Sequence, residues 1–175
     1  VGAGEYEDYA TWNTEYGWLT AGAGRVDLTG RALGEAYYTR VALEEASGPW
    51  LAVCPVSHTG DKHSPSAWKM SNAIDSWSWN GCEGRKANVE GCARAASVSL
   101  VLNGREIGRK AMRNDCIARF SCTYEPGTLE AVAYDESGRE IGRNQLVSAS
   151  AETRLSASVE YAGRELAYVR VRYTD

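Results

Sequence analysis

The stretch Ser97-Val-Ser-Leu-Val-Leu-Asn-Gly-Arg-Glu-Ile-Gly-Arg-Lys110 decides the fold class of this 175-residue chain. In its first half Val98, Leu100 and Leu102 occupy every second position. A period of two places these side chains on one face of a half-buried β-strand. Asn103-Gly104 then favours a type I′ turn, which joins antiparallel strands in a hairpin. The stretch therefore predicts a strand, a tight turn and a returning strand.

The same alternation recurs along most of the chain. It is found at Ala118, Phe120, Cys122 and Tyr124, at Leu155, Ala157 and Val159, and at Val169, Val171 and Tyr173. Turn residues separate these runs: Pro126-Gly127 fits a type II turn, and residues 135–138 form a longer hairpin loop. Short strands at this spacing, with no helices between them, predict an antiparallel β-sandwich.

One earlier segment has helical periodicity. Leu33, Tyr37 and Val41 recur at i, i+4 and i+8, and Gly48-Pro49 ends the pattern. We expect a helix near 32–46 whose apolar stripe must be covered. The stripe can fold back on the same chain or form a homodimer with a second copy.

A short motif is repeated: NGREIGR at 103–109 recurs as SGREIGR at 137–143. We interpret the repeat as a turn and outgoing strand used twice, rather than as a repeated ligand site. In this interpretation Ile107 and Ile141 face a core, while the charged side chains face water.

Composition excludes several function classes. A formal net charge of −4 and a pI near 5.3 argue against nucleic-acid binding. No run approaches the ~20 apolar residues of a membrane span, so no membrane association is expected. The chain starts at Val1 without a signal-like stretch, which suggests an excised piece. Five cysteines cannot all pair within one chain and favour reduced thiols in a cytoplasmic protein, with an extracellular or periplasmic location as the alternative.

Four motifs in order resemble the region after the catalytic barrel in family 2 glycoside hydrolases of the β-galactosidase type. WSWNGCEGRK at 77–86 resembles the family's WNWxGxEGK, and 97–110 resembles its VELFLNGKSLGRK. TYEPGTLEAVAYDESGREIGR at 123–143 is similar to PYEPGTLKAVAYDxxGKEVAR. GRELAYVRVRYTD at 163–175 is similar to GxDLAYVxVxVxD, which begins the family's next sandwich domain. Ordered motifs are more specific than one short match.

A looser match lies upstream. GRVDLTGRALGEAYYTRVAL at 24–43 resembles the end of the family's (β/α)8 barrel, but Arg31-Ala32-Leu33 replaces the usual Phe-Pro-Lys. The resemblance thus implies three parts: a barrel remnant at 1–48, an immunoglobulin-like β-sandwich at 49–149, and, at 150–175, the start of a following sandwich or an added strand. It implies a non-catalytic fragment that supports the barrel of the same parent chain, with β-galactosides as ligands and no cofactor.

The catalytic carboxylates of the resembled family are absent. Retaining glycosidases use two carboxyl groups, and the family's acid/base glutamate lies in an Asn-Glu pair, which this sequence lacks. Glu5, Glu7 and Asp8 lie in a polar stretch with no apolar setting to raise a carboxyl pKa. We therefore expect the chain itself to be inactive.

Two further clusters have a weaker chemical signal. Cys54, His58 and His63 lie in one loop, but a fourth zinc ligand is missing, so no metal is expected. Cys82 and Cys92 form a disulfide only if the fold brings them together.

Trp68, Trp77 and Trp79 are the candidate sugar-stacking residues. In the alternative that we favour, they fill the seam between sandwich and barrel, because Trp77 and Trp79 share one strand face. Two other functions stay open: a carbohydrate-binding module that uses exposed Trp, and a bacterial immunoglobulin-like surface domain. Buried Trp favours the structural role, and exposed Trp favours sugar binding.

Overall fold

The computed structural model describes residues 25–26, 32–46, 48–60, 71–150 and 152–174. This part of the chain contains one α-helix, α1 (Gly34–Ala42), and one short 3-10 helix, η2 (Val56–His58). The strands are β1 (Trp50–Val53), β2 (Lys86–Cys92), β3 (Ser97–Leu102), β4 (Arg105–Ala111), β5 (Ile117–Thr123), β6 (Thr128–Tyr134), β7 (Glu140–Val147), β8 (Arg154–Ala162) and β9 (Ala167–Thr174). Neither helix in the described ranges is long and apolar enough to cross a bilayer.

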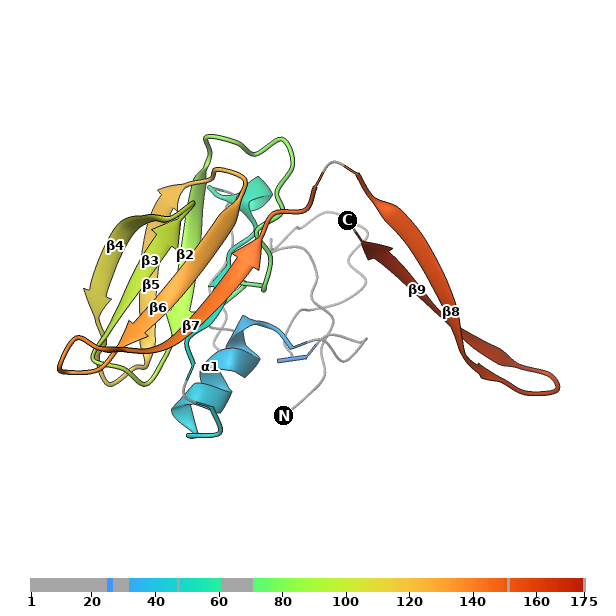
Figure 1. The fold of residues 1–175 in the computed structure, drawn as a ribbon, viewed down its shortest axis with the longest axis horizontal. Coiled ribbons are helices and arrows are strands. Elements are labelled where there is room, and N and C mark those ends of the chain that lie inside the picture. Colours follow the sequence, from blue (N-terminus) through green and yellow to red (C-terminus); the bar gives the residue numbers. More distant parts are fainter. Residues whose placement is uncertain (1–24, 27–31, 47, 61–70, 151, 175) are drawn as a thin grey trace, which may run out of the picture.

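Two antiparallel sheets form a sandwich, which confirms the predicted fold class (Figure 1). One sheet has the order β1-β2-β5 and the other the order β4-β3-β6-β7. The alternating apolar side chains of both sheets meet in one core. Its larger members include Leu51, Val53, Val56, Trp77, Val89, Val98, Leu100, Leu102, Phe120, Tyr124 and Leu129.

The hairpin predicted at 97–110 is present. Asn103 and Gly104 have φ angles of 50° and 77°, as a type I′ turn requires. The Asn103 side chain also donates a hydrogen bond to the Pro126 carbonyl and accepts one from the Thr128 amide. The β3–β4 turn is therefore tied to the turn that precedes β6.

The repeated motif produces a β-bulge in each edge strand of the four-stranded sheet. Leu100 pairs with Gly108 and Val101 with Glu106, so Ile107 has no opposite residue. In the same way, Ala133 pairs with Gly142 and Tyr134 with Glu140, so Ile141 is the extra residue. A bulge disrupts the ladder locally and bends its strand.

The prediction that both isoleucines face the core is only half right. Ile107 packs partly buried against the core, whereas 44% of Ile141 is exposed. Each isoleucine is the extra residue of a bulge, so the two-residue alternation no longer determines which way its side chain points.

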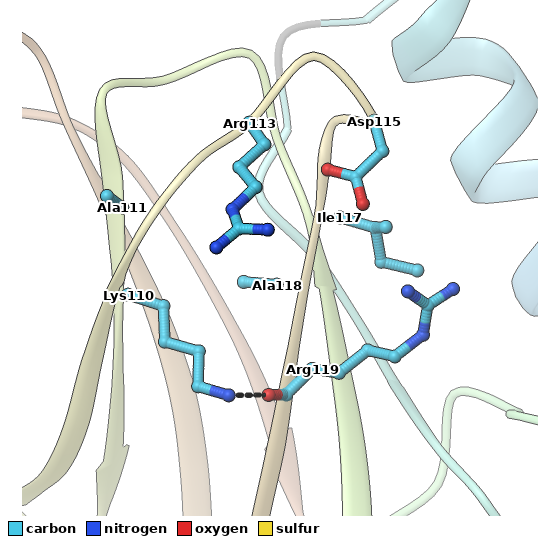
Figure 2. Close-up of a pocket in the computed structure, with 7 residues that line it drawn as sticks. All are labelled: Lys110, Ala111, Arg113, Asp115, Ile117, Ala118 and Arg119. Atoms are coloured by element: carbon cyan, nitrogen blue, oxygen red, sulfur yellow. Dashed lines mark hydrogen bonds between the residues drawn. The ribbon is translucent and has the colours of Figure 1, made fainter.

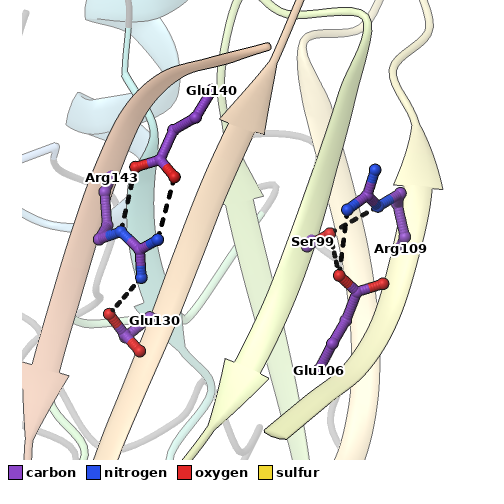
Figure 3. A network of polar contacts seen from close by, with 6 residues as sticks. All are labelled: Ser99, Glu106, Arg109, Glu130, Glu140 and Arg143. Atoms are coloured by element: carbon purple, nitrogen blue, oxygen red, sulfur yellow. Dashed lines mark hydrogen bonds and ion pairs between the residues drawn. The ribbon is translucent and has the colours of Figure 1, made fainter. Parts of the chain in front are cut away.

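Arginine–glutamate pairs cover the outer face of the four-stranded sheet (Figure 3). Arg109, Ser99, Val132 and Arg143 lie opposite one another in a row across β4, β3, β6 and β7. Ser99 and Val132 point away from the core, yet they are 0% and 1% exposed. The flanking arginines and their carboxylate partners therefore shield them from water.

Each arginine in this row holds a glutamate three residues earlier. Arg109 Nη2 lies 3.1 Å from a carboxylate oxygen of Glu106, and this bond, with one from the Ser99 hydroxyl, keeps the pKa of Glu106 below its usual value. Arg143 binds both Glu140 and Glu130, and its hydrogen bonds likewise lower the pKa of Glu140. The repeated motif thus forms the same arginine–glutamate ion pair, three residues apart, in both edge strands.

A helix is present where one was predicted near 32–46, but it is shorter: α1 spans only Gly34–Ala42. Its stripe is covered within the chain: Leu33, Tyr37 and Val41 are 6%, 9% and 0% exposed. The helix contacts β1 and β2. A second copy of the chain is not needed to cover this stripe.

Strands β8 and β9 form a separate two-stranded ribbon that extends away from the sandwich (Figure 1). Their described residues are all exposed. The large apolar side chains on the ribbon include Leu155, Val159, Tyr161, Tyr168, Val169, Val171 and Tyr173.

The packing of Phe120 allows the assignment of the sandwich core to be tested. Phe120 is 7% exposed, and its ring lies over the two glycines Gly91 and Gly108, which leave room for it.

We predict that Phe120→Ala lowers the free energy of unfolding by about 3–5 kcal/mol, through lost burial and the remaining cavity. Urea denaturation measures this loss. Ile141→Ala, at the exposed bulge, is the control and should change stability by less than about 0.5 kcal/mol. A loss below about 1 kcal/mol for Phe120→Ala contradicts its inward assignment.

Candidate functional site

The predicted sugar-stacking tryptophans lie in different surroundings. Trp77 is 1% exposed, donates from its indole nitrogen to the Glu125 carbonyl at 3.0 Å, and meets Tyr124 edge to face. Trp77 is therefore closed to a ligand in this structure. Trp79 is half-buried against the core and lines a pocket. Trp68 lies outside the described residues.

The ring that fills the seam between α1 and the sandwich is Trp50, which the sequence analysis did not single out. Its ring stacks on that of Tyr37, with centroids 4.8 Å apart and planes 12° from parallel. The guanidinium carbon of Arg40, on the last turn of α1, lies 5.8 Å from the Trp50 ring centroid. The only sequence signal was the position of Trp50, directly after the predicted helix stop at Gly48-Pro49.

Polar contacts fix both ends of α1 to neighbouring segments. At the start, the Gly34 amide donates to the Ala73 carbonyl at 2.9 Å, and a Cβ at position 34 would lie only 2.5 Å from that oxygen. At the end, Arg94 donates to the carbonyls of Val41 and Ala42, each at 2.9 Å. The last carbonyls of a helix have no amide partner four residues on; the Val41 carbonyl also accepts from the Glu44 amide at 3.2 Å, and a cation there suits the helix dipole.

Two buried acids, one on α1 and one on β2, line a cavity of about 170 Å³. Glu35 and Glu90 are 6% and 8% exposed. Ser71 joins them, since its amide donates to Glu35 at 3.0 Å and its hydroxyl donates to Glu90 at 2.6 Å. Arg119 forms an ion pair with Glu90 at 3.4 Å. This cluster connects α1, the segment at 71–73, β2 and β5.

A larger hollow of about 430 Å³ opens between edge strands β4 and β5 (Figure 2). Three cationic side chains and one acid line it: Lys110, Arg113, Arg119 and Asp115. The Lys110 ammonium donates to the Arg119 carbonyl, while the Arg113 guanidinium points into the hollow in Figure 2. Such a lining attracts anions. Among the described residues that line the hollow there is neither a thiol nor a pair of carboxyl groups.

The sequence left a Cys82–Cys92 disulfide open and predicted no metal at Cys54, His58 and His63. Cys82 and Cys92 are free thiols, because Cys82 lies in the turn before β2 and Cys92 is the last residue of that strand. Among the described residues, which include Cys54 and His58 but not His63, no group of three or more His, Cys, Asp or Glu could hold a metal ion.

Three thiols are poorly suited to nucleophilic chemistry. Burial, followed by the nearby charge of Glu90, raises the pKa of Cys54 and of Cys92 to about 12. Burial and the charge of Glu125 raise the pKa of Cys122 to about 11. Because the thiolate is the reactive form, these groups are largely unreactive at neutral pH.

We predict that iodoacetamide at about pH 8 modifies Cys54 and Cys92 slowly in the folded chain and rapidly in urea, where burial is lost. Peptide mass spectrometry after timed quenching measures each site. Complete labelling of all five cysteines in urea is the control for reagent activity. Equal rates at Cys54 in the folded and unfolded chain would contradict the burial assigned here.

Comparisons with known proteins place this geometry in context. A family model described as "Domain of unknown function (DUF4982)" matches residues 84–142. No curated protein gave a significant sequence match.

Several solved structures with a similar fold are glycoside hydrolases. A glycosyl hydrolase family 2 member from Bacteroides cellulosilyticus DSM 14838 has a TM-score of 0.70 and 24% identity, over 87% of this chain and 21% of that one. A second structure of a family 2 member from Bacteroides cellulosilyticus gives 0.70 and 27%, over the same shares. A β-glucuronidase of family 2 gives 0.58 and 15%, over 89% of this chain and 15% of that one.

The chain spans about a fifth of the length of the first two structures. At 24% and 15% identity, the first and the third structures show the shared fold alone. Together with the sandwich described above, the likeness at 27% identity supports a non-catalytic β-sandwich domain of a family 2 glycoside hydrolase.

Proposed function

We propose that the chain is a non-catalytic part of a retaining glycoside hydrolase of the β-galactosidase type, in which the sandwich at 49–149 supports the catalytic barrel. Residues 1–48 belong to the end of that barrel, and residues 150–175 begin a following sandwich domain. The parent protein is cytoplasmic. Its barrel, in the same chain, is the partner of the sandwich.

The attachment of α1 carries this proposal. A barrel helix that only happened to precede the sandwich would need no specific contacts with it. Instead, Tyr37 stacks on Trp50, Arg94 binds the last carbonyls of α1, and Gly34 permits the close approach to Ala73. Contacts at the start, middle and end of one helix leave it little freedom to shift, which is what a supporting domain must supply to a neighbour.

The β-galactosidase type is the finer part of the proposal. It rests on the four ordered motifs between 77 and 175. A β-glucuronidase has a similar fold, so fold alone does not select the sugar. In this proposal the barrel, and not the sandwich, selects the substrate.

A carbohydrate-binding role is a second candidate, favoured by one observation. Trp79 lines a pocket at the surface, whereas Trp77 is enclosed. No contact in the described part of the chain favours the bacterial surface-domain hypothesis. The two remaining roles are compatible, because a supporting domain can also hold part of a polymeric substrate.

The seam can be tested in the chain itself. We predict that Trp50→Ala weakens the hydrogen-exchange protection of α1 amides by about 2- to 13-fold, which corresponds to loss of an aromatic pair. Trp50→Phe, which retains a stacking ring, should restore most of it. Protection of β3 and β6 amides shows that the sandwich stays folded, and Arg143→Ala on the outer face is the matched control. Unchanged α1 protection in Trp50→Ala would show that the stack does not hold the helix.

Activity tests the remaining parts of the proposal. The purified chain should release only background nitrophenol from nitrophenyl β-galactoside, because the sequence lacks the family's Asn-Glu pair. Turnover that disappears in Glu5→Gln or Glu7→Gln would overturn this expectation.

The substrate type is tested in a longer protein that carries this sequence after a barrel. Preference for the β-galactoside over the β-glucuronide supports the β-galactosidase type, and the reverse preference rejects it.

A further inference from the structure

A pocket of about 440 Å³ lies where the sandwich meets the linker to the β8–β9 ribbon. Trp79, Asn80 and Glu83 line it from the segment before β2. Ser148 and Ser150, which follow β7, and Thr153, which precedes β8, line the opposite wall. The volume is within the range of small-ligand sites.

Hydrogen bonds hold the two walls together without a ligand. The Ser148 hydroxyl donates to the Trp77 carbonyl and accepts from the Gly127 amide at 3.1 Å. The Ala149 amide donates to the Ser78 hydroxyl at 2.8 Å. The linker is thus fixed to the sandwich at two consecutive residues, and the pocket is preformed.

The aromatic wall is fixed as well. The Trp79 amide donates to the Tyr124 hydroxyl at 3.0 Å, and Tyr124 is itself 2% exposed in the core. The Trp79 side chain packs partly buried against that core. A ring anchored in this way loses little conformational entropy when a ligand packs on it.

The lining has the chemistry that recognises a neutral polyhydroxylated ligand. An indole offers an apolar surface for C–H groups, the Asn80 amide both donates and accepts, and the Glu83 carboxylate accepts from hydroxyl groups. The Ser150 and Thr153 hydroxyls already donate, to the Glu152 carbonyl at 3.0 Å and to the Tyr173 hydroxyl at 3.1 Å, so toward a ligand they serve as acceptors. No Lys or Arg is among the described residues that line this pocket, in contrast to the hollow in Figure 2. An anionic ligand would find one carboxylate here and no cation.

We propose that this junction pocket binds a neutral saccharide, at a site that takes no part in bond cleavage. The choice of a saccharide among neutral polyhydroxylated ligands rests on the proposed function. The pocket is open and offers one partly buried ring, so binding is weak, with a Kd of about 1 mM. Weak sites of this kind hold a polymer near an enzyme while leaving it free to move.

The test is an NMR titration of the isotope-labelled chain with β-1,4-galactobiose, cellobiose and glucuronate. Saturable shifts of the Asn80 side-chain amide, the Trp79 indole N–H and the Thr153 amide with a neutral disaccharide are expected. Asn80→Ala and Thr153→Ala change exposed residues and should each weaken binding about 3- to 10-fold, the equivalent of one hydrogen bond. Arg113→Ala, in the other hollow, is the matched control and should bind as the parent chain does.

Three results would overturn the site. One is the absence of saturable shifts with either disaccharide up to about 20 mM, well above the expected Kd. Another is binding that Asn80→Ala and Thr153→Ala leave unchanged. The third is a response to glucuronate alone, centred on Arg113.

The outcome is separable from that of the proposed function. In one outcome, the longer protein cleaves neither glycoside while the chain still binds a disaccharide in this pocket. That result rejects the hydrolase proposal, and the saccharide site remains supported. Glycoside cleavage by the longer protein with no shifts at Trp79 or Asn80 rejects the site alone.

Discussion

The inner faces of β2 and β5 pack against those of β3 and β6, and most other features of the structure depend on this burial. Val98, Leu100 and Leu102 from one sheet meet Val89 and Phe120 from the other in a single core. Because side chains alternate along a strand, a slip of one residue would turn this set toward water. The core therefore fixes the register, and the register fixes which residues reach the outer face, the α1 seam and the junction pocket.

The repeated motif shows how one short sequence can protect both edges of a sheet. β4 and β7 are the edge strands, and each carries a bulge at the isoleucine of its Arg-Glu-Ile-Gly-Arg stretch. A bulge discourages pairing with another strand, and charged side chains on an edge do the same. The arginine that follows each bulge also turns back over the sheet and covers Ser99 or Val132. The same residues thus protect the sheet edges from pairing and shield the outward-facing Ser99 and Val132 from water.

Sequence patterns predicted the features that depend on local chemistry. The period of two, the Asn103-Gly104 turn and the buried stripe Leu33, Tyr37 and Val41 all follow from a residue and its near neighbours. The exposure of Ile141 did not follow from near neighbours, because the bulge that takes this residue out of the alternation depends on pairing with the partner strand. The role of Trp50 was missed and that of Trp77 was left open. Trp50 begins β1 and Trp77 lies in the segment before β2, and only tertiary packing separates a stacked ring from an enclosed one. The junction pocket needs two segments some 70 residues apart, as the bond between Ala149 and Ser78 illustrates (|i−j| = 71).

The contrast between α1 and the ribbon gives the proposed domain order its physical basis. On one face of the ribbon Leu155 lies opposite Tyr173, and Val159 lies opposite Val169, while serines and arginines occupy the other face. The helix stripe is covered by the sandwich, but this ribbon face is not, and a two-stranded sheet is marginal by itself. An amphipathic ribbon of this kind suits one layer of a further sandwich, as proposed for residues 150–175. The junction pocket would then lie between two domains, where ligand sites are frequent, and the two hydrogen-bonded linker residues would set the angle between them.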